Sequence, residues 1–449
     1  MLKQLLKWTG FAVLGVALAV ALSNTPVLAK DLGGVNYNDN DYNKIVAFLN
    51  QPSAVKEKTN AQVLGWDIDD PYDWEWYDEE FVWNKDNPKR IISIELEYDE
   101  LAGKLDVSNF TKLVSLDVDA KNLASLDTNG CTALKSISIE SSKITKLDVS
   151  NLYKLVSFDV YAKNLTSLNT NGCKALKSIS IRDSKITRLD LSHNINLTRI
   201  DCTDNSKLSK LDLSKNAKLT TLFCYDNNLT KLDISKNTKL KELYCSNNKL
   251  TTLNVSKNTN LASLECRRNK LTALNVSKNA NLTYLECSHN KLKKLDVSKC
   301  TKLHALVCEN NEITSLSVAG CTKLAMLDCC NNKITKLDVR GNKWLSSFFC
   351  INNKITKLDL SNNKLVEFGC TENPITQINV AIGGKKINLK ANGKGYVGLI
   401  SAEGDGFVSA TPQKGKKFVS WTQNGKVISG KSKFEIFYGK SYNLVANFK

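Results

Sequence analysis

Apolar residues recur along most of the chain in units of 21 residues. The unit that begins at Leu250 has six apolar positions, which are Leu250, Leu253, Val255, Leu261, Leu264 and Cys266. About fourteen units are present, and they begin at Ala102, Leu123, Ile144, Leu165, Ile186, Leu208, Leu229, Leu250, Leu271, Leu292, Ile313, Ile334, Ile355 and Ile375. One such unit cannot bury its apolar side alone, so successive units are predicted to stack into a solenoid with a continuous core.

Within each unit, one short segment alternates between inward and outward residues. In Leu264-Glu265-Cys266 the alternation has a period of two, which is typical of a β-strand with one buried face. Stacked coils bring these strands side by side into a parallel sheet, with about 4.8 Å between neighbouring strands. Each position of the repeat therefore becomes a row that runs along the solenoid.

The residues of these units resemble a known family. The segment that contains Leu240, Leu243, Cys245, Asn248 and Leu250 resembles the consensus of leucine-rich repeats. The LDVSxN stretches between such segments are similar to the 21-residue bacterial class, above all to listerial internalins whose repeats carry cysteine. The resemblance implies a mainly β protein, namely a curved, right-handed solenoid with a parallel concave sheet. It also implies a role in protein binding or adhesion outside the cell.

The N-terminus departs from the repeat. Lysines precede an apolar stretch from Trp8 to Leu22, so residues 1–29 are predicted to be a signal peptide that is cut before Lys30. An uncleaved membrane anchor is the alternative, although the apolar stretch is shorter than the roughly 20 residues of a spanning helix. After cleavage, the chain is expected not to span a membrane.

Residues 30–98 are predicted to form a small, α-containing N-terminal cap for the solenoid. Residues 41–55 have the apolar spacing of a short helix, and Ile92, Ile94 and Leu96 alternate as in a strand. A tryptophan cluster between them is expected to pack over the first coil, with stacking against sugars as the alternative; it comprises Trp66, Trp74, Trp76 and Trp83.

The solenoid is predicted to span residues 99–381, and a small β module is predicted at residues 382–449. The module contains short apolar strands such as Phe418–Trp421 and Leu444–Phe448, which are divided by glycines. Its sequence is similar to divergent internalin B-type repeats, and this resemblance implies a spacer or an adhesion module.

The 14 cysteines fall mainly into two columns of the repeat. One column holds aliphatic residues in the first units, so its cysteines are predicted to be buried free thiols: Cys202, Cys224, Cys245, Cys266, Cys287, Cys308, Cys329, Cys350 and Cys370. The other column combines cysteines with asparagines that are expected to bond turn backbone groups: Cys131, Cys173, Cys300 and Cys321 with Asn216, Asn237, Asn258 and Asn279. Cys300 and Cys321 are also candidates for a disulfide. Cys330 is predicted to point outward and to be the reactive thiol.

The fifth position of the unit is often acidic, at Asp148, Asp190, Asp212, Asp233, Asp296, Asp338 and Asp359. The residue two places earlier is basic in the same units, at Lys146, Arg188, Lys210, Lys231, Lys294, Lys336 and Lys357. Residues i and i+2 of a strand share a face, so these are predicted to be surface charge pairs. A calcium site is the alternative, because calcium prefers oxygen ligands.

The outward positions around the strands change character along the chain. The early units carry polar and acidic residues such as Asp117, Asp119 and Glu140, whereas later units carry aromatic and aliphatic ones. Exposed aromatic residues on adjacent coils are typical of binding surfaces. The predicted partner-binding residues on the concave face are Phe223, Tyr225, Tyr244, Arg267, Tyr284, Val307, Met326, Phe349 and Ile351.

Composition narrows the function. The three histidines, His193, His289 and His304, lie in different units, so no catalytic site, metal site or cofactor site is expected. The chain is predicted to be a secreted or cell-surface protein, a monomer, that binds an extracellular or host protein or mediates adhesion; nucleic acid is not expected as a partner. The net charge of +17 supports an alternative, which is polyanion or glycan binding at the cell wall through turn lysines such as Lys236, Lys239, Lys257 and Lys278.

Overall fold

The computed structural model describes residues 34–70, 74, 80–140, 142–360, 362–382, 384–402, 405–437 and 440–449. The predicted signal peptide at residues 1–29 and Trp76 lie outside the described residues. No helix in the described part of the chain is long and apolar enough to cross a membrane. The chain divides into two compact units, of which the first ends at Cys173 and the second begins at Lys174.

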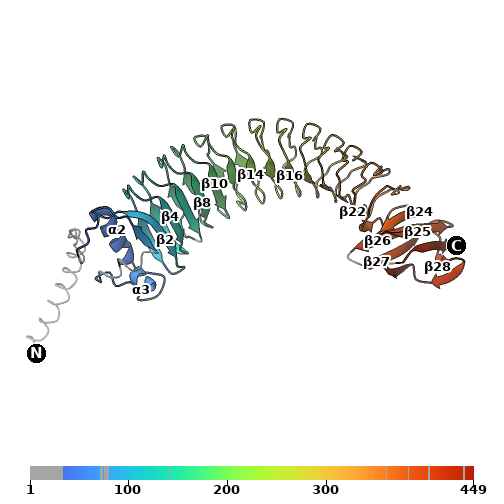
Figure 1. Ribbon diagram of the computed structural model, residues 1–449, viewed down its shortest axis with the longest axis horizontal. Helices are drawn as coiled ribbons and strands as arrows, with labels where there is room; N and C mark the ends of the chain where they lie inside the picture. Colours follow the sequence, from blue (N-terminus) through green and yellow to red (C-terminus); the bar gives the residue numbers. More distant parts are fainter. Residues whose placement is uncertain are drawn as a thin grey trace, which may run out of the picture. The chain divides into compact units, whose positions relative to one another are not determined.

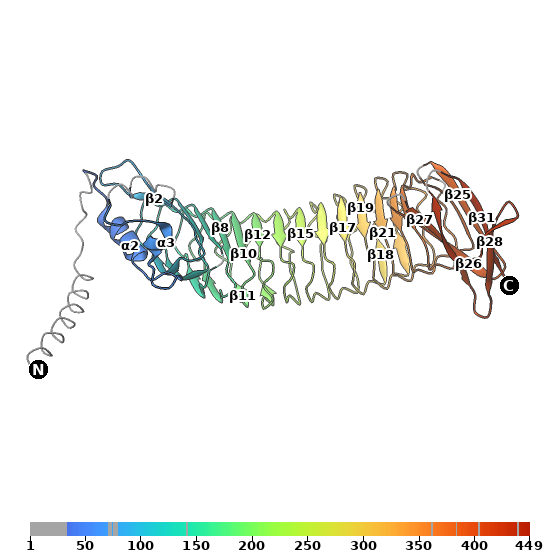
Figure 2. The ribbon, with the colours of Figure 1, turned by 90° about the horizontal axis from the view of Figure 1, so that it is seen from below.

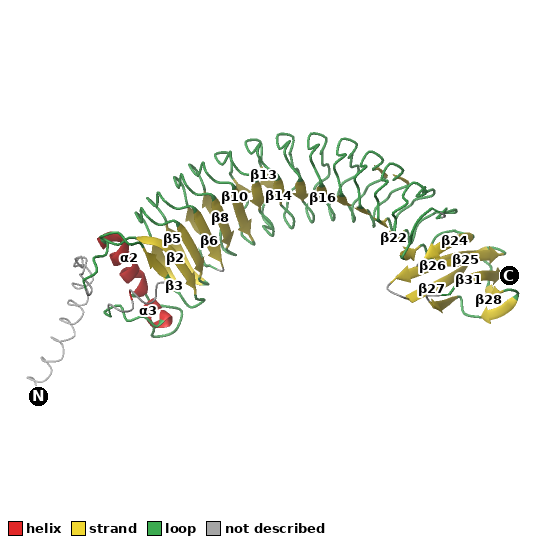
Figure 3. Cartoon of the chain, in the orientation of Figure 1, coloured by secondary structure: helices red, strands yellow, loops and turns green. Residues whose placement is uncertain are grey.

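The first unit opens with two short helices, which Figure 3 distinguishes from the strands. Helix α2 (Asp39–Leu49) begins at Asn38, whose side chain accepts a hydrogen bond from a first-turn backbone N–H at 3.4 Å. Helix α3 (Asn60–Leu64) follows after a turn. The helix predicted over residues 41–55 is therefore shorter than expected, because Pro52 cannot continue it.

The main sheet of the first unit takes one strand from each coil. Strand β1 (Phe81–Trp83) pairs antiparallel with β2 (Ile91–Glu97), and the following strands pair in parallel. They are β4 (Ser115–Asp119), β6 (Ser136–Glu140) and β8 (Ser157–Tyr161). A second set of short strands forms two parallel pairs, β3 (Ala102–Asp106) with β5 (Asn122–Asp127) and β7 (Lys146–Asp148) with β9 (Ser167–Asn169).

The predicted strand before the first coil is present as β2. Ile94 and Leu96 are buried as the alternation predicts, but Ile91 is buried at the start of the strand where Ile92 was expected. The pairing of β1 with β2 contains a register shift, and such an irregularity moves a side chain to the other face.

The described tryptophans of the N-terminal region pack among other side chains. Trp66 and Trp74 are buried with their ring centroids 5.5 Å apart, and Trp74 also lies 4.6 Å from Tyr42 of α2. Trp83 packs edge-on against Tyr37 at 4.8 Å. These rings therefore pack in the core of the N-terminal region, where Trp66 also lies 5.4 Å from Phe81 of β1, and this agrees with a packing role for the cluster.

The second unit contains the longest run of repeats. One strand per coil lies parallel to the next, as Figure 2 shows. The register places each residue beside its equivalent in the following coil. The strands are β10 (Ser178–Arg182), β12 (Arg199–Asp201), β14 (Thr221–Phe223), β15 (Glu242–Tyr244), β16 (Ser263–Glu265), β17 (Tyr284–Glu286), β19 (Ala305–Val307), β21 (Met326–Asp328), β22 (Ser347–Phe349) and β23 (Glu367–Gly369). Within this unit they line the inner side of the curve that its coils form (Figure 1). The predicted parallel-sheet solenoid is confirmed.

A second, shorter set of strands lies elsewhere on these coils. It consists of two parallel pairs, β11 (Arg188–Leu189) with β13 (Lys210–Leu211) and β18 (Lys294–Asp296) with β20 (Ser315–Ser317). We call the surface around this set, including the aspartate column and the turns that follow it, the turn face.

The interior of each coil follows the repeat. In the unit that begins at Leu250, Leu261, Leu264 and Cys266 are fully buried, and Leu253 is nearly so. The nine cysteines of the strand column, Cys202 through Cys370, are buried free thiols, as predicted. Burial raises the pKa of Cys245 to about 12. These thiols thus act as small apolar side chains.

Buried side-chain donors satisfy the backbone carbonyls of the turns. In the column predicted to do so, the Asn237 amide donates to the carbonyls of Leu213 and Asn216 at 3.1 and 2.9 Å. Cys321 replaces asparagine in that column, and its thiol donates to the Val297 carbonyl at 3.1 Å. Cys300 likewise has a free thiol, so the alternative of a Cys300–Cys321 disulfide is wrong for this structure.

A further asparagine column lies just after the sheet strands, and only its member Asn248 was noted in the sequence, as part of the repeat consensus. The Asn269 amide donates to the carbonyls of Cys245 and Cys266 at 3.0 and 3.2 Å, and its oxygen accepts from the Leu250 N–H at 3.0 Å. The same column contains Asn205, Asn227, Asn248, Asn290, Asn311, Asn332, Asn353 and Asn373. Each of these amides bonds the coil before it, so the column holds neighbouring coils together.

The C-terminal module continues the second unit without a break. Strands β26 (Gly395–Ala402), β27 (Asp405–Pro412) and β30 (Lys433–Phe437) extend the main sheet, because β26 pairs antiparallel with β23. The Cys370 N–H donates to the Leu399 carbonyl at 2.8 Å. A second sheet contains β24 (Gln377–Ile382), β25 (Lys385–Asn392), β31 (Tyr442–Phe448), β28 (Phe418–Gln423) and β29 (Lys426–Ser429). The module thus covers the edge of the solenoid sheet, and a covered edge is protected from pairing with other chains.

Candidate binding surface

The nine predicted partner-binding residues all lie on one surface of the second unit. We call this surface the sheet face: the outward positions of β14 to β22 together with the residue after each buried cysteine. Most of the nine side chains are half-buried, whereas Arg267 and Met326 are exposed. The parallel register places equivalent positions of successive coils side by side. Six of the nine lie in groups near the two ends of the face, and Arg267, Tyr284 and Val307 lie on the coils between these ends.

The first group is a stack of three side chains. Phe223 and Tyr244 occupy equivalent positions in β14 and β15, and their rings stack with centroids 4.7 Å apart and planes 2° from parallel. The Arg199 guanidinium lies 4.4 Å from the centroid of the Phe223 ring. Arg199 was missed in the sequence analysis, because it stands one coil earlier and at a different strand position. The rigid stack leaves the Tyr244 ring at its end.

The second group lies near β22 and β23. A Cβ atom added to Gly369 would lie 2.8 Å from Phe349 Cδ1 and 3.0 Å from Ile351 Cδ1. Both side chains therefore lean over the space that glycine leaves open. Met326, which is 38% exposed, precedes them on β21. The apolar residues at this end are thus held by their neighbours and remain partly open to solvent.

Between the two apolar groups the sheet face is acidic. We call Glu242, Glu265, Glu286, Glu309 and Asp328 the acidic centre. Partial burial and the neighbouring carboxylate of Glu286 raise the pKa of Glu265. Partial burial, then Glu286 and Glu265, raise the pKa of Tyr284 to about 12. Glu286 accepts a hydrogen bond from the Ser288 N–H at 3.2 Å and is only 9% exposed.

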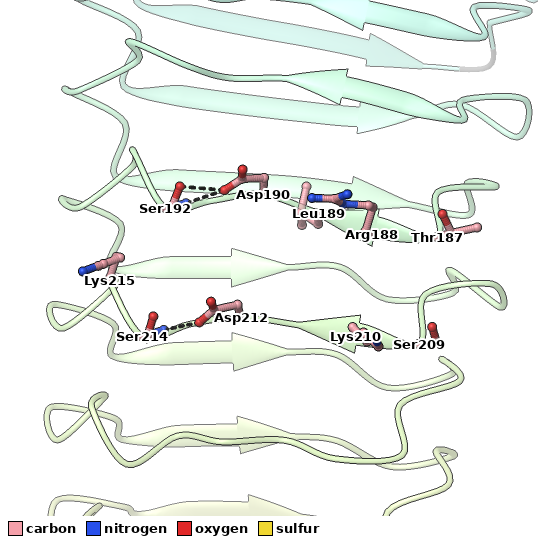
Figure 4. Close-up of a pocket in the computed structure, with 10 residues that line it drawn as sticks. All are labelled: Thr187, Arg188, Leu189, Asp190, Ser192, Ser209, Lys210, Asp212, Ser214 and Lys215. Carbon is pink, nitrogen blue, oxygen red and sulfur yellow. Dashed lines mark hydrogen bonds between the residues drawn. The ribbon is translucent and has the colours of Figure 1, made fainter.

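Among the described residues of the turn face, the aspartates from Asp148 to Asp338 form no ion pair within 4.0 Å with the base two places earlier, contrary to our prediction, and Asp338 pairs with Arg340 at 2.8 Å instead. Asp190 accepts hydrogen bonds from the N–H and hydroxyl of Ser192 at 3.0 and 2.7 Å, and Asp212 accepts from the Ser214 N–H at 2.9 Å, as Figure 4 shows. In the neutral units asparagine makes the same bond, for example Asn254 with the Ser256 N–H at 3.0 Å. The column therefore selects a side-chain oxygen that caps the turn, and the hydrogen bonds lower the pKa of these aspartates.

An open hollow lies between two neighbouring coils of the turn face (Figure 4). Its volume is about 620 Å³, and its lining includes Arg188, Lys210 and Lys215 with the hydroxyls of Thr187 and Ser209. In the described part of the chain, no three histidine, cysteine or acidic side chains are placed to hold a metal ion. The hollow is therefore lined by cations, hydroxyls and capping carboxylates.

Cys330 corrects another prediction. The residue follows the buried Cys329, and we expected it to be exposed and reactive. Instead it is 8% exposed, and burial followed by the carboxylate of Asp328 raises the pKa of its thiol. Large side chains on adjacent coils, Glu309 and Ile351, occupy the equivalent positions on either side of it. An outward position on this face is thus not necessarily an exposed one.

Comparison with known protein families identifies the repeat in one part of the chain. A family model for leucine-rich repeats (two copies) matches residues 280–320. No curated protein sequence matches the chain at a significant level.

The similarity to solved structures covers more of the chain. The functional domain of InlJ from Listeria monocytogenes, which includes a cysteine ladder, has a TM-score of 0.60 and 24% identity, covering 80% of this chain and 90% of that one. A leucine-rich-repeat protein of Leptospira interrogans has a TM-score of 0.49 and 22% identity, covering 61% and 84%. An internalin, InlF of Listeria monocytogenes, has a TM-score of 0.45 and 21% identity, covering 64% and 82%. Residues 280–320 therefore contain leucine-rich repeats, and the fold of the chain is similar to that of the InlJ domain.

Proposed function

We propose that this protein is exported and captures an extracellular or host protein on its sheet face. The observation that carries the proposal is the pair of partly exposed apolar groups on that face. The anchors are the residues predicted from the sequence: Phe223, Tyr225, Tyr244, Arg267, Tyr284, Val307, Met326, Phe349 and Ile351. Aromatic and arginine side chains dominate the binding energy of protein interfaces, which supports this assignment.

The rigidity of the surface supports the same role. The Phe223 and Tyr244 rings are already stacked, and every strand below them is paired on both sides. Side chains that are ordered before binding lose little conformational entropy when a partner arrives. The sheet face therefore has the preorganisation that a capture surface requires.

The proposal also concerns the cellular location and the oligomeric state of the protein. The apolar stretch after the N-terminal lysines supports export, with loss of residues 1–29, and we propose a monomer at or near the cell surface. We also propose that the protein is a binder and not an enzyme, with no cofactor. The C-terminal module, residues 382–449, would protect the sheet edge and serve as a spacer or adhesion module.

The test is capture of partners from an extracellular protein preparation by residues 30–449, which include every described residue. Tyr244→Ala combined with Phe349→Ala should reduce recovery of the captured protein about tenfold or more, because two anchors are lost. The matched control is Tyr153→Ala combined with Phe437→Ala, which removes the same two side-chain types where they are 56% and 69% exposed outside the sheet face. Equal loss in both double variants, or loss in neither, would contradict the proposal.

The hollow on the turn face favours a second candidate function, binding of a polyanion or glycan at the cell wall. Arg188, Lys210 and Lys215 line it, and Lys236 lies in the adjoining hollow of about 500 Å³. Lys239, Lys257 and Lys278 are exposed on the turns of the following coils. Retention on purified cell walls should then fall steeply as the ionic strength rises, and it should also fall in the Lys210→Ala variant. Capture of a protein partner by the aromatic groups should persist in salt.

A further inference from the structure

The acidic centre stands out against the charge of the whole chain. The chain carries a net charge of +17 and is rich in lysine. Nevertheless, no lysine occupies any outward position of β15, β16, β17, β19 or β21, or the position after the buried cysteine of these coils. Arg267 is the single base among these positions. Lys241, Arg268 and His289 lie at the border, and His289 Nε2 is 3.6 Å from Glu309 Oε1. The sheet face thus has the opposite sign to the molecule that carries it.

The geometry brings the carboxylates close together. Glu265 and Glu286 are register partners in the adjacent strands β16 and β17, which places their Cα atoms about 4.8 Å apart along the sheet. Their mutual repulsion contributes to the raised pKa of Glu265. Arg267 acts in the opposite direction but does not offset burial and Glu286, since the pKa of Glu265 remains raised. A bound cation would relieve the repulsion, so the site favours one.

A second, independent observation comes from Ser288. Its side chain lies on the sheet face, because the preceding residue Cys287 is fully buried in the interior. Ser288 is only 2% exposed, and its hydroxyl oxygen has no hydrogen-bond partner among the described residues. The hydroxyl of Ser246, at the equivalent position two coils earlier, is also buried without a partner among the described residues. Buried hydroxyls of this kind indicate positions where a further polar partner fits. Ser288 lies two residues after Glu286. In the row of residues that follow the buried cysteines, Ser288 stands between Arg267 and Glu309.

We infer that the acidic centre binds a lysine- or arginine-bearing segment of the protein partner, whose flanking apolar side chains contact the two apolar groups. The inference rests on the proposed function and adds the chemistry of the partner. Tyr244 and Phe349 lie five strand steps apart at the same strand position, or about 24 Å. An extended segment of about eight residues spans that distance. Its cationic side chains would lie over Glu265, Glu286 and Glu309.

The two faces of the solenoid would then select opposite partners. A polyanion would be repelled by the acidic centre and attracted to the turn face. A basic segment has the reverse preference. Charge complementarity of this kind determines specificity and association rate more than affinity.

The test uses two extended peptides of about eight residues. Both carry tryptophan at each end; one has two arginines between them, and the other has neutral citrullines. Fluorescence anisotropy with residues 30–449 should show the arginine peptide binding at least about tenfold more tightly. Glu265→Gln combined with Glu286→Gln should remove this preference, because glutamine keeps the shape and the acceptor for the Ser288 N–H without the charge.

The matched control is Asp212→Asn combined with Asp233→Asn, which removes two negative charges from the turn face. Asparagine already fills this column at Asn254 and Asn275, where it makes the same turn bond. The control should retain the full preference for arginine.

The inference is overturned if both peptides bind equally, or if the control loses the preference as much as the glutamate variant. Failure of the proposed function itself gives a different result. In that case Tyr244→Ala with Phe349→Ala leaves protein capture unchanged. Capture that depends on Tyr244 and Phe349 while both peptides bind equally would leave the sheet-face function standing and reject only the preference for a basic segment.

Discussion

The sheet face and the turn face of the second unit come from the same repeat but obey different rules. On the turn face, the capping position is aspartate or asparagine in nearly every coil, because its oxygen accepts a backbone N–H, as with Asp212 and Asn254. On the sheet face, the outward positions of β15 to β22 make few such backbone bonds. They vary from Glu265 to Val307 to Phe349 in equivalent places. Where a side chain is not needed to bond the backbone, the residue can vary to suit a binding partner.

The largest expected loss of stability is at the asparagine column whose side chains bond backbone groups of neighbouring coils. Asn269→Ala removes the amide that donates to the carbonyls of three residues, Cys245, Cys266 and Arg267. It also leaves the buried Leu250 N–H without its acceptor. We expect the free energy of unfolding to fall by about 3 kcal/mol, because buried unsatisfied groups cost about 1–3 kcal/mol each. Urea unfolding followed by circular dichroism measures it. Asn260→Ala, an exposed asparagine with one backbone bond, serves as the control and should lose far less.

A smaller effect is expected at the capping column of the turn face. Asp296 accepts the Ser298 N–H at 2.9 Å, so Asp296→Ala should destabilise the fold by about 1 kcal/mol. Asp296→Asn should be nearly neutral, because asparagine provides the same oxygen. If both variants lost the same stability in urea, charge pairing with Lys294 would be the better explanation of this column.

The smallest effect, and the one of opposite sign, is expected on the sheet face. Burial and Glu286 raise the pKa of Glu265, so the ionised carboxylate opposes folding. The stability that the protonated Glu265 carboxyl contributes is complete below the pKa of this group in the unfolded chain. It is lost as the pH rises through the raised pKa of the group in the folded chain. Glu265→Gln should therefore stabilise the protein by a few tenths of a kcal/mol at neutral pH, since the site is partly screened by solvent.

Urea unfolding at neutral pH and near pH 4 measures this difference. The gain from Glu265→Gln should shrink at the lower pH, where the native carboxyl is already protonated. A loss of stability at neutral pH would mean that Glu265 supports the fold, and the contrast between the two faces would fail there.

Much of the fold could be predicted because burial leaves few choices. The period of 21, the leucine positions and the row from Cys202 to Cys370 all follow from side chains that must fill one continuous interior. The membership of the sheet face could be predicted for a related reason. Once Leu264 and Cys266 point inward, Glu265 and Arg267 must point outward.

The site itself could be predicted only in part. Phe223 and Tyr244 were identified, but Arg199 beside them was not, since its role depends on a diagonal contact between coils. Cys330 was wrongly expected to be exposed, because its covering side chains belong to other repeats. The aspartate column was misread as charge pairs, since a lysine two places earlier is visible in the sequence and a turn N–H is not.

The length of the coil, the inward rows and the side of each coil on which a residue lies can all be read from the amino-acid pattern. These features depend on local alternation and on burial, and both are visible within each repeat. The contacts between outward side chains, the covering of the small ones and the pairing of the C-terminal module with β23 required the folded chain. Such contacts link residues about 21 positions or more apart, and no rule of burial applies to an exposed face.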